Sequence, residues 1–252
     1  MTTSYEPIVP RARIGFIIPS SNRMVEPQMH RYMPAGVVPH FTRIGMTNRH
    51  KAPLEQLIPR ITAAADLLAD SKCDVIVLQC TGTSMSGGVD MDKHVVAEIA
   101  KMTKRPALST ASALNEAFAA LRARRLVFIS ETKQADHDKK LAYLREAGYD
   151  IVADKAASLA GTDAYCTTPP QFWYDIAMAL RNDAADAYFL SCANIHSIDV
   201  IEQLERDLGK PVVTSNQAAL WCSLRTAGIR DDVSGLGALL RIDAKVRSAA
   251  AA

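Results

Sequence analysis

Long hydrophobic runs and targeting signals are absent from this sequence. No apolar stretch approaches the roughly 18 residues that a bilayer-spanning helix requires. Residues 1–15 also lack a charged region followed by an apolar one, the pattern of a secretion signal. We therefore expect a cytoplasmic protein that has no membrane partner.

A large excess of charge of one sign is missing as well. The 29 Lys and Arg residues nearly balance the 27 Asp and Glu residues, and the formal net charge is +2. Proteins that bind nucleic acid present clustered basic residues, whereas the charges here are interspersed along the chain. We expect a small-molecule ligand and no nucleic acid.

Cysteine is sparse and follows no disulfide or metal-binding pattern. The five cysteines stand at positions 73, 80, 166, 192 and 222, and none belongs to a CxxC pair. This spacing argues against a disulfide scaffold and against a zinc site, so we expect free thiols and no metal. Cys73, Cys166 and Cys222 are interpreted as core residues.

What the sequence does contain is an internal repeat. The segment RIGFI from Arg13 resembles RLVFI from Arg125, and CDVIVLQC ending at Cys80 resembles ADAYFLSC ending at Cys192. Both pairs are separated by 112 positions. A third pair, RPALSTASAL at 105–114 and KPVVTSNQAA at 210–219, is separated by 105 positions. Three matches in the same order predict two copies of a unit of roughly a hundred residues.

Each unit has the pattern of an α/β fold. Apolar runs without alternation, separated by helical spacing, are typical of parallel strands covered by helices on both faces. The expected strands are 14–19, 75–79, 106–108, 126–130, 187–191 and 212–214, and the expected helices lie at 53–69, around 95–100, 139–147, 170–181 and 198–208. We expect an N-terminal domain of residues 1–113 plus 219–252 and a C-terminal domain of residues 114–218.

Three polar segments directly follow predicted strands. They are PSSN at 19–22, CTGTS at 80–84 and SCAN at 191–194. The carboxyl ends of parallel strands share one edge of a sheet, so these segments should lie together there. If the two units face each other about a pseudo-twofold axis, Cys80 and Cys192 approach a ligand from opposite sides.

Two thiols facing one ligand indicate chemistry at carbon. A free thiol has a pKa of about 8.5, and a position before a helix N-terminus favours the thiolate. Backbone N–H groups at the same place suit carboxylate oxygens, as do the side chains of Ser20, Ser21, Asn22, Thr81, Thr83 and Asn194. Such a pair can relay protons across a carbon acid, or one thiol can add to carbon while the other handles the proton.

The most specific segments of the chain are PSSNRMVEPQM at 19–29, the Cys80-Thr81 pair, SCANIHSIDVIEQLE at 191–205 and GKPVVTSNQAALW at 209–221. With these segments the sequence resembles the aspartate/glutamate racemase superfamily, and within it the maleate cis-trans isomerase branch, which is related to arylmalonate decarboxylase. The resemblance implies two pseudosymmetric flavodoxin-like domains with the active site in the cleft between them.

Individual residues distinguish the branches of this superfamily. Glutamate racemases carry an Asp-Ser-Gly motif after the first strand and a histidine two positions past the second cysteine. This sequence has Pro19, Ser20 and Ser21 at the first place and Asn194 at the second. Arylmalonate decarboxylases have glycine where this chain has Cys80. The isomerase branch keeps both cysteines and the asparagine of PSSN.

The resemblance also implies a mechanism that needs no cofactor. Cys80 would add to an alkene carbon and Cys192 would act as acid and base, so that the former double bond can rotate. The implied substrate-binding residues are Ser20, Asn22, Thr81, Gly82, Thr132, Asp163, Ala193 and Asn194.

Two of these positions depart from the isomerase pattern. Thr132 stands where the family usually has a tyrosine, and Asp163 stands where isomerases often have asparagine. The departures extend the candidate substrates to substituted or mono-amidated relatives of maleate. The alternative functions are a racemase or decarboxylase of another carbon acid and a non-catalytic binding protein for a small acid. A homo-oligomer is expected for an enzyme of this size.

Overall fold

The computed structural model describes residues 9–243 and consists of two parallel four-stranded sheets with helices around them. The first sheet has the strand order β2-β1-β3-β4 and the second has the order β6-β5-β7-β8. The strands of the first sheet are β1 (Ala12–Pro19), β2 (Val37–Ile44), β3 (Val75–Leu78) and β4 (Ala107–Ser109). Those of the second are β5 (Arg125–Ser130), β6 (Asp150–Ala156), β7 (Ala187–Ser191) and β8 (Val212–Thr214).

Helices connect the strands in the manner of right-handed βαβ units. In the first half these are α1 (Val25–Tyr32), α2 (Leu54–Asp70), α3 (Thr81–Met85), α4 (Gly88–Thr103) and α5 (Thr110–Ala120), with a 3-10 turn η1 (Asn48–His50). In the second half they are α6 (Gln134–Glu146), α7 (Thr162–Thr167), α8 (Pro170–Ala179), η2 (Ser197–Val200), α9 (Ile201–Leu208), α10 (Ser215–Thr226) and α11 (Gly237–Leu240).

The repeat predicted from the sequence is present in the sheet register. Ile14 of β1 pairs with Val75 of β3, and Leu126 of β5 pairs with Ala187 of β7. Both partners of the second pair lie 112 positions after those of the first. The shared strand order is the one that flavodoxin-like folds use for their first four strands. The prediction of an α/β fold with two pseudosymmetric flavodoxin-like halves is confirmed.

The third repeat pair also has a structural counterpart. Helices α5 and α10 each begin at a capping box, formed by Ser109 with Ser112 and by Thr214 with Gln217. In each box the cap side chain accepts the backbone N–H three residues on, and that residue's side chain bonds back to the cap backbone. The two cap residues are 105 positions apart, which is the separation of the two segments in the third repeat pair.

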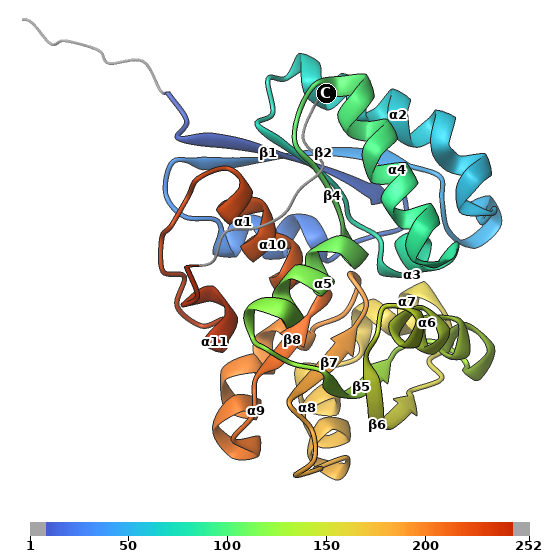
Figure 1. Cartoon of the computed structure of the whole chain (residues 1–252), viewed down its shortest axis with the longest axis vertical. Helices are drawn as coiled ribbons and strands as arrows, with labels where there is room; N and C mark the ends of the chain where they lie inside the picture. The colour runs from blue at the N-terminus through green and yellow to red at the C-terminus, as the bar shows by residue number, and fades with distance from the viewer. Residues whose placement is uncertain (1–8, 244–252) are drawn as a thin grey trace, which may run out of the picture.

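Two apolar clusters form the core, one within the first half and one shared by both halves. On the outer face of the first sheet, α2 buries Leu54, Leu57, Ile61 and Leu68 at helical spacing against α4 and the sheet. The inner face belongs to a second apolar cluster that continues through α5 and α10 into the second sheet. Figure 1 shows the sheets one above the other along the long axis, with α5 and α10 between them. One continuous core therefore fixes the cleft geometry.

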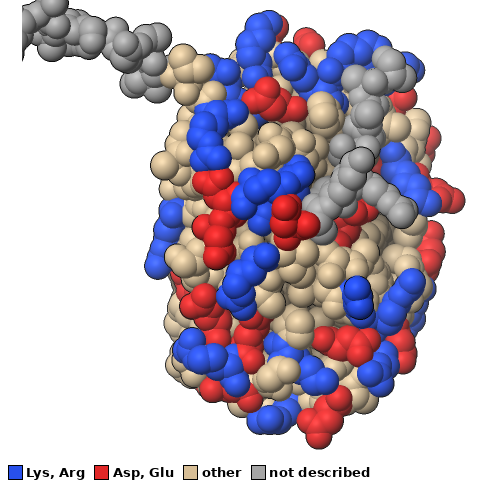
Figure 2. All heavy atoms as spheres, turned by 60° about the vertical axis from the view of Figure 1, so that its left-hand side comes forward, with Lys and Arg blue, Asp and Glu red and all other residues tan. Residues whose placement is uncertain are grey.

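The surface bears charges of both signs. On the face drawn in Figure 2, Lys and Arg side chains alternate with Asp and Glu side chains without a large region of one sign. Within residues 9–243, no helix has both the length and the apolar character needed to cross a bilayer.

Candidate active site

Both predicted catalytic cysteines line one cavity. Its volume is about 710 Å³, and it opens where β1, β3, β5 and β7 end. Of the other residues predicted to bind substrate, the ones that line this cavity are Asn22, Thr81, Gly82, Thr132, Ala193 and Asn194. The structure thus brings most of the sequence-predicted residues together.

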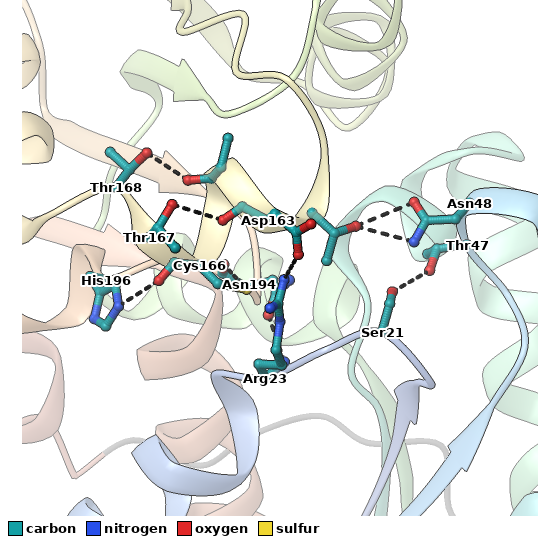
Figure 3. A network of polar contacts seen from close by, with 12 residues as sticks. Ser21, Arg23, Thr47, Asn48, Asp163, Cys166, Thr167, Thr168, Asn194 and His196 are labelled. Atoms are coloured by element: carbon teal, nitrogen blue, oxygen red, sulfur yellow. Dashed lines mark hydrogen bonds and ion pairs between the residues drawn. The ribbon is translucent and has the colours of Figure 1, made fainter.

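Ser20 and Asp163 lie in a different place. They line a shallower depression beside the cavity, together with Arg23 and Arg43. The Asp163 carboxylate is 92% exposed and forms an ion pair with Arg23 (Figure 3). Arg23 therefore balances the negative charge of Asp163 at the rim of the site.

Cys80 lies two residues after the end of β3 and is the N-cap residue of α3. It is 7% exposed, and its Sγ is hydrogen-bonded to the Thr83 hydroxyl at 3.1 Å. The sequence predicted that the helix start would favour the thiolate, but α3 has only five residues. Burial raises the pKa of Cys80, and the bond with Thr83 and the charge of Lys140 oppose this increase. Desolvation outweighs the stabilising contacts at this thiol.

Cys192 directly follows β7 in a backbone conformation that is rare outside glycine. Its φ is 129°, its N–H donates to the Ser215 hydroxyl at 3.1 Å, and the Asn194 N–H donates to its Sγ at 3.3 Å. Burial and the nearby Glu131 carboxylate raise the pKa of Cys192 well above its ordinary value, with Lys140 opposing them. At neutral pH this sulfur is a protonated thiol.

Asn22 connects the two halves at the base of the cavity. Its Nδ2 donates to the Ala193 carbonyl at 3.0 Å, and its Oδ1 accepts the backbone N–H groups of Met24 and Val25, which begin α1. Asn194 forms a second hydrogen bond between the halves, because its Oδ1 accepts the Arg23 N–H at 2.8 Å. These contacts place the loop after β1 directly against the loop after β7.

Sequence reasoning missed Ser215 as part of this arrangement. Its hydroxyl lies 2.8 Å from Thr81 Oγ1 and also accepts the Cys192 N–H, so one buried oxygen joins the two cysteine loops. Its neighbour Asn216 adds a second junction, since it accepts from Gln79 and donates to the Ala193 carbonyl. The segment KPVVTSNQAA contains both residues, and the repeat was the available signal.

A buried ion pair was also missed. Lys140 Nζ lies 2.7 Å from Glu131 Oε2, with the side chains 4% and 7% exposed, and both residues line the cavity. Lys140 also donates to the Ser191 hydroxyl at 3.3 Å, next to Cys192. The feature of the sequence that could have indicated Lys140 is its helical spacing with the buried Leu141 and Leu144. This spacing places the lysine on the inner face of α6.

A phenol reaches the cavity from an unexpected element. Thr132 stands where a tyrosine was expected, but Tyr165 of α7 lines the same cavity. Burial raises the pKa of Tyr165, and the charge of Glu131 raises it further. Tyr165 is therefore a neutral hydrogen-bond donor at the site.

A chain of hydrogen bonds leads away from Thr132. Its hydroxyl lies 3.1 Å from the Ser130 hydroxyl, which lies 2.7 Å from His137 Nδ1, and His137 Nε2 lies 2.9 Å from Asp154. His137 is fully buried and stacks on Phe128. These contacts fix the orientation of the Thr132 hydroxyl at the cavity wall.

Polar contacts within each half and between the halves line the outer rim of the site (Figure 3). Asn48 of η1 is hydrogen-bonded to Thr162 at the start of α7 at 3.1 Å, and Ser21 is bonded to Thr47 at 3.1 Å. Cys166, predicted to be a core residue, is only partly buried; its Sγ lies 3.7 Å from the Asn194 carbonyl. His196 bonds to the Cys166 carbonyl at 3.0 Å.

The titratable residues do not form a metal site among the residues that the structure describes. No group of three or more His, Cys, Asp or Glu side chains there is placed to hold an ion. All five cysteines are free thiols. The chemistry available from the described side chains is that of two thiols, a buried ion pair and hydrogen-bond donors.

Two pseudosymmetric parallel sheets, with one cysteine from each half at a shared cavity, define a class of two-domain α/β proteins with the site between the domains. The chain belongs to the arylmalonate decarboxylase family, whose model matches residues 14–240. It is 28% identical over 244 residues to a maleate isomerase of Nocardia farcinica, covering 93% of this chain and 97% of that protein. It is 23% identical over 218 residues to an arylmalonate decarboxylase of Bordetella bronchiseptica, covering 85% of this chain and 90% of that one.

Solved structures agree with this assignment. A mutant of the Nocardia farcinica maleate cis-trans isomerase with a covalently bound succinylcysteine intermediate has a TM-score of 0.85 and 27% identity, covering 92% of this chain and 99% of that one. The same enzyme bound to TRIS has a TM-score of 0.84 and 28% identity, covering 91% and 98%. The family resemblance inferred from the sequence motifs is confirmed.

Proposed function

We propose that the protein catalyses the cofactor-independent cis-trans isomerisation of maleate or a maleate-like small carboxylate. One observation carries the proposal: two buried cysteines, one from each half of the repeat, line the same cavity. The likeness to enzymes named maleate isomerase supports it.

The reaction balances in bonds and protons when it starts after the Cys80 thiol, whose pKa is raised by burial, has released its proton to solvent. The Cys80 thiolate forms a C–S bond to one alkene carbon, and the π electrons move to the adjacent carbon and its carboxylate. The Cys192 thiol gives its proton to that carbon, so the adduct is a thioether with a C–C single bond and Cys192 is left as a thiolate. After rotation, Cys192 removes the proton, the C–S bond breaks and the trans alkene leaves.

Hydrogen-bond donors at the cavity wall would stabilise the charge that develops in this reaction. We assign the substrate carboxylates to the backbone N–H groups around Thr81 and Ala193, with Asn22, Asn194 and Thr132 nearby. Donors placed where an enediolate forms typically supply a large part of the rate enhancement. Tyr165 supplies the phenol that Thr132 lacks. Ser20 and Asp163 act from the rim, where Arg23 neutralises the carboxylate.

The cavity also bears on the range of substrates. Its volume of about 710 Å³ exceeds that of a four-carbon dicarboxylate, and part of its wall is formed by Met46, Leu54, Met85 and Met91. Methionine side chains adapt to irregular apolar groups. A maleate that carries a small apolar substituent therefore fits the site, and comparing kcat/KM for maleate, methylmaleate and maleamate measures the preference.

Proton NMR of the purified protein with maleate in D2O under reducing conditions tests the proposed activity. We expect a fumarate signal with the wild type and none with Cys80→Ala or Cys192→Ala. A racemase or decarboxylase would leave maleate unchanged and convert another carbon acid. A binding protein would shift the maleate signal without forming product, and either result would overturn the proposal.

A further inference from the structure

The two halves of the molecule differ at one place that matters for the cysteines. The internal repeat makes Cys80 and Cys192 equivalent in position, yet the proposed reaction needs one nucleophile and one proton donor. A difference between them must come from side chains that the repeat does not share. The buried pair of Glu131 and Lys140 is such a difference.

The repeat identifies the counterparts of this ion pair. At the offset of 112 that relates the two cysteines, Glu131 corresponds to Pro19, and Lys140 corresponds to Gln28. Gln28 is buried like Lys140, but it is uncharged and donates to the Ile195 carbonyl at 3.0 Å. The first half therefore has uncharged residues at the two positions where the second half has an ion pair.

The ion pair is close enough to the reacting groups to act on them. It lines the cavity with both sulfurs, and Lys140 is held against the end of β7 by its 3.3 Å bond to Ser191. Two opposite charges buried together form a dipole, and a dipole is screened weakly away from water. Its effect on two sulfurs at different positions has to differ.

The electrostatics of the two thiols agree with this polarity. Burial is the largest influence on each thiol and raises its pKa. At Cys192 the Glu131 carboxylate comes next and raises the pKa further, with more effect than the opposing Lys140. At Cys80 the order is reversed, because Lys140 lowers the pKa with more effect than Glu131 raises it. Tyr165 also faces Cys192 and stays neutral.

We propose that the Glu131–Lys140 ion pair breaks the pseudosymmetry of the two cysteines, keeping Cys192 as the proton donor and leaving Cys80 as the nucleophile. The assignment of catalytic roles rests on the proposed function, whereas the difference in thiol reactivity does not. Glu131 and Lys140 act through the sulfurs and are positioning residues. After Cys192 has given up its proton, the neighbouring Glu131 makes the thiolate a strong base for the return step.

Alkylation by iodoacetamide tests this without any substrate. The rates at Cys80 and Cys192 are followed separately by peptide mass spectrometry from pH 6 to pH 10 (~0.5-unit steps) in the wild type and in the double variant Glu131→Gln/Lys140→Met. We expect Cys80 to react at lower pH than Cys192 in the wild type. In the double variant the ratio of the two rates at pH 8 should fall about tenfold, the change that one pKa unit produces.

The double variant is preferred to Lys140→Met alone, because the single change leaves a buried carboxylate without a partner and threatens folding. Asp90→Asn is the matched control, since it removes one charge from an exposed pair on α4. An unchanged rate ratio in the double variant, or a wild type in which Cys192 reacts first, overturns the proposal. If the ratio falls while maleate is not converted, the ion pair keeps its role and the proposed function fails.

Discussion

The backbone of Cys192 carries strain at the site of the proposed chemistry. A φ of 129° is unfavourable for any residue with a Cβ, and such strain costs on the order of 1–3 kcal/mol. The contacts with Ser215 and Asn194 hold the conformation. Cys80, its counterpart in the repeat, has an ordinary extended backbone with φ of −153°.

This contrast gives a stability prediction. We expect Cys192→Gly to be more stable than Cys192→Ala by about 1 kcal/mol, because glycine adopts this backbone without steric cost. At Cys80 the order should be reversed, since there glycine only adds flexibility to the unfolded chain. Chemical unfolding of the four variants measures both differences. A Cys192→Gly variant less stable than Cys192→Ala contradicts the strain assignment.

Site residues could be predicted where they stand in a sequence motif. They could not be predicted where only a tertiary contact brings them to the site. Cys80, Cys192, Asn22 and Asn194 stood in segments that follow strands, and they line the cavity. Lys140 stood in no such motif, because it becomes a site residue only when α6 brings its Nζ to 3.3 Å from the Ser191 hydroxyl at the end of β7. The roles of all these residues remain predictions until the variants are measured.

Among the strands, those buried along most of their length were predicted, including the short edge strands β4 and β8, whereas the edge strands β2 and β6 were not. β3 and β7 are buried along their whole length, so their apolar runs were visible in the sequence. β2 and β6 lie at sheet edges and are half-buried. The proline in β2, Pro39, is of the kind that edge strands tolerate. A strand that is only partly buried has a less continuous run of apolar residues in the sequence and is therefore harder to predict.

The helix α4 contains a buried carboxyl group that should make the fold sensitive to pH. Asp92 is 2% exposed, and its Oδ1 has no hydrogen-bond partner among the described residues. Burial raises its pKa from 3.8 to about 7, against the smaller opposing effects of Ser109 and Lys93. Because the folded pKa lies above the unfolded one, this group's stabilising effect is complete below about pH 4 and is lost as pH rises through 7.

We therefore expect Asp92→Asn to raise the thermal midpoint at pH 8 and to change it much less at pH 4. A shift of one pKa unit corresponds to about 1.4 kcal/mol, so the effect at pH 8 should be a few kcal/mol at most. Scanning calorimetry at both pH values, with the exposed Asp90→Asn on the same helix as control, measures it. Equal midpoint shifts at both pH values would argue against a buried ionising group.

At the scale of the whole molecule, the site depends on how the halves are joined. Ser215 links the Thr81 hydroxyl to the Cys192 N–H across the repeat. Ser215→Ala leaves that buried N–H without its partner, which costs about 1–3 kcal/mol. We expect reduced stability and a lower kcat, because the strained Cys192 loses one of its two supports.

Ser223→Ala is a suitable control for this change. Ser223 is buried in the same helix, α10, but among residues 9–243 its hydroxyl bonds only to the Leu220 carbonyl within that helix. It should lose stability without a matching change in kcat. If Ser215→Ala and Ser223→Ala affect thermal unfolding and turnover equally, the junction has no special part in catalysis.

The repeat made the overall architecture predictable, since two copies of a parallel α/β unit have few ways to pack. The contacts between the copies were not predictable, because they join residues more than a hundred positions apart, such as Asn22 with Ala193. The domain boundaries at 113 and 218 stay a prediction, and α10 contacts both α5 and β3 near one of them. The expected homo-oligomer and cytoplasmic location stay predictions as well.

Mass spectrometry of the Cys192→Ser variant after incubation with maleate tests the two-thiol account most directly. Water can protonate the carbanion formed on addition, but serine is too weak a base to remove that proton again, so the reaction should stall at the thioether. We expect a stable adduct of one maleate on the peptide that contains Cys80, and no adduct in Cys80→Ala/Cys192→Ser. A wild type that converts maleate while the variant forms no adduct, or an adduct on another cysteine, would contradict the account.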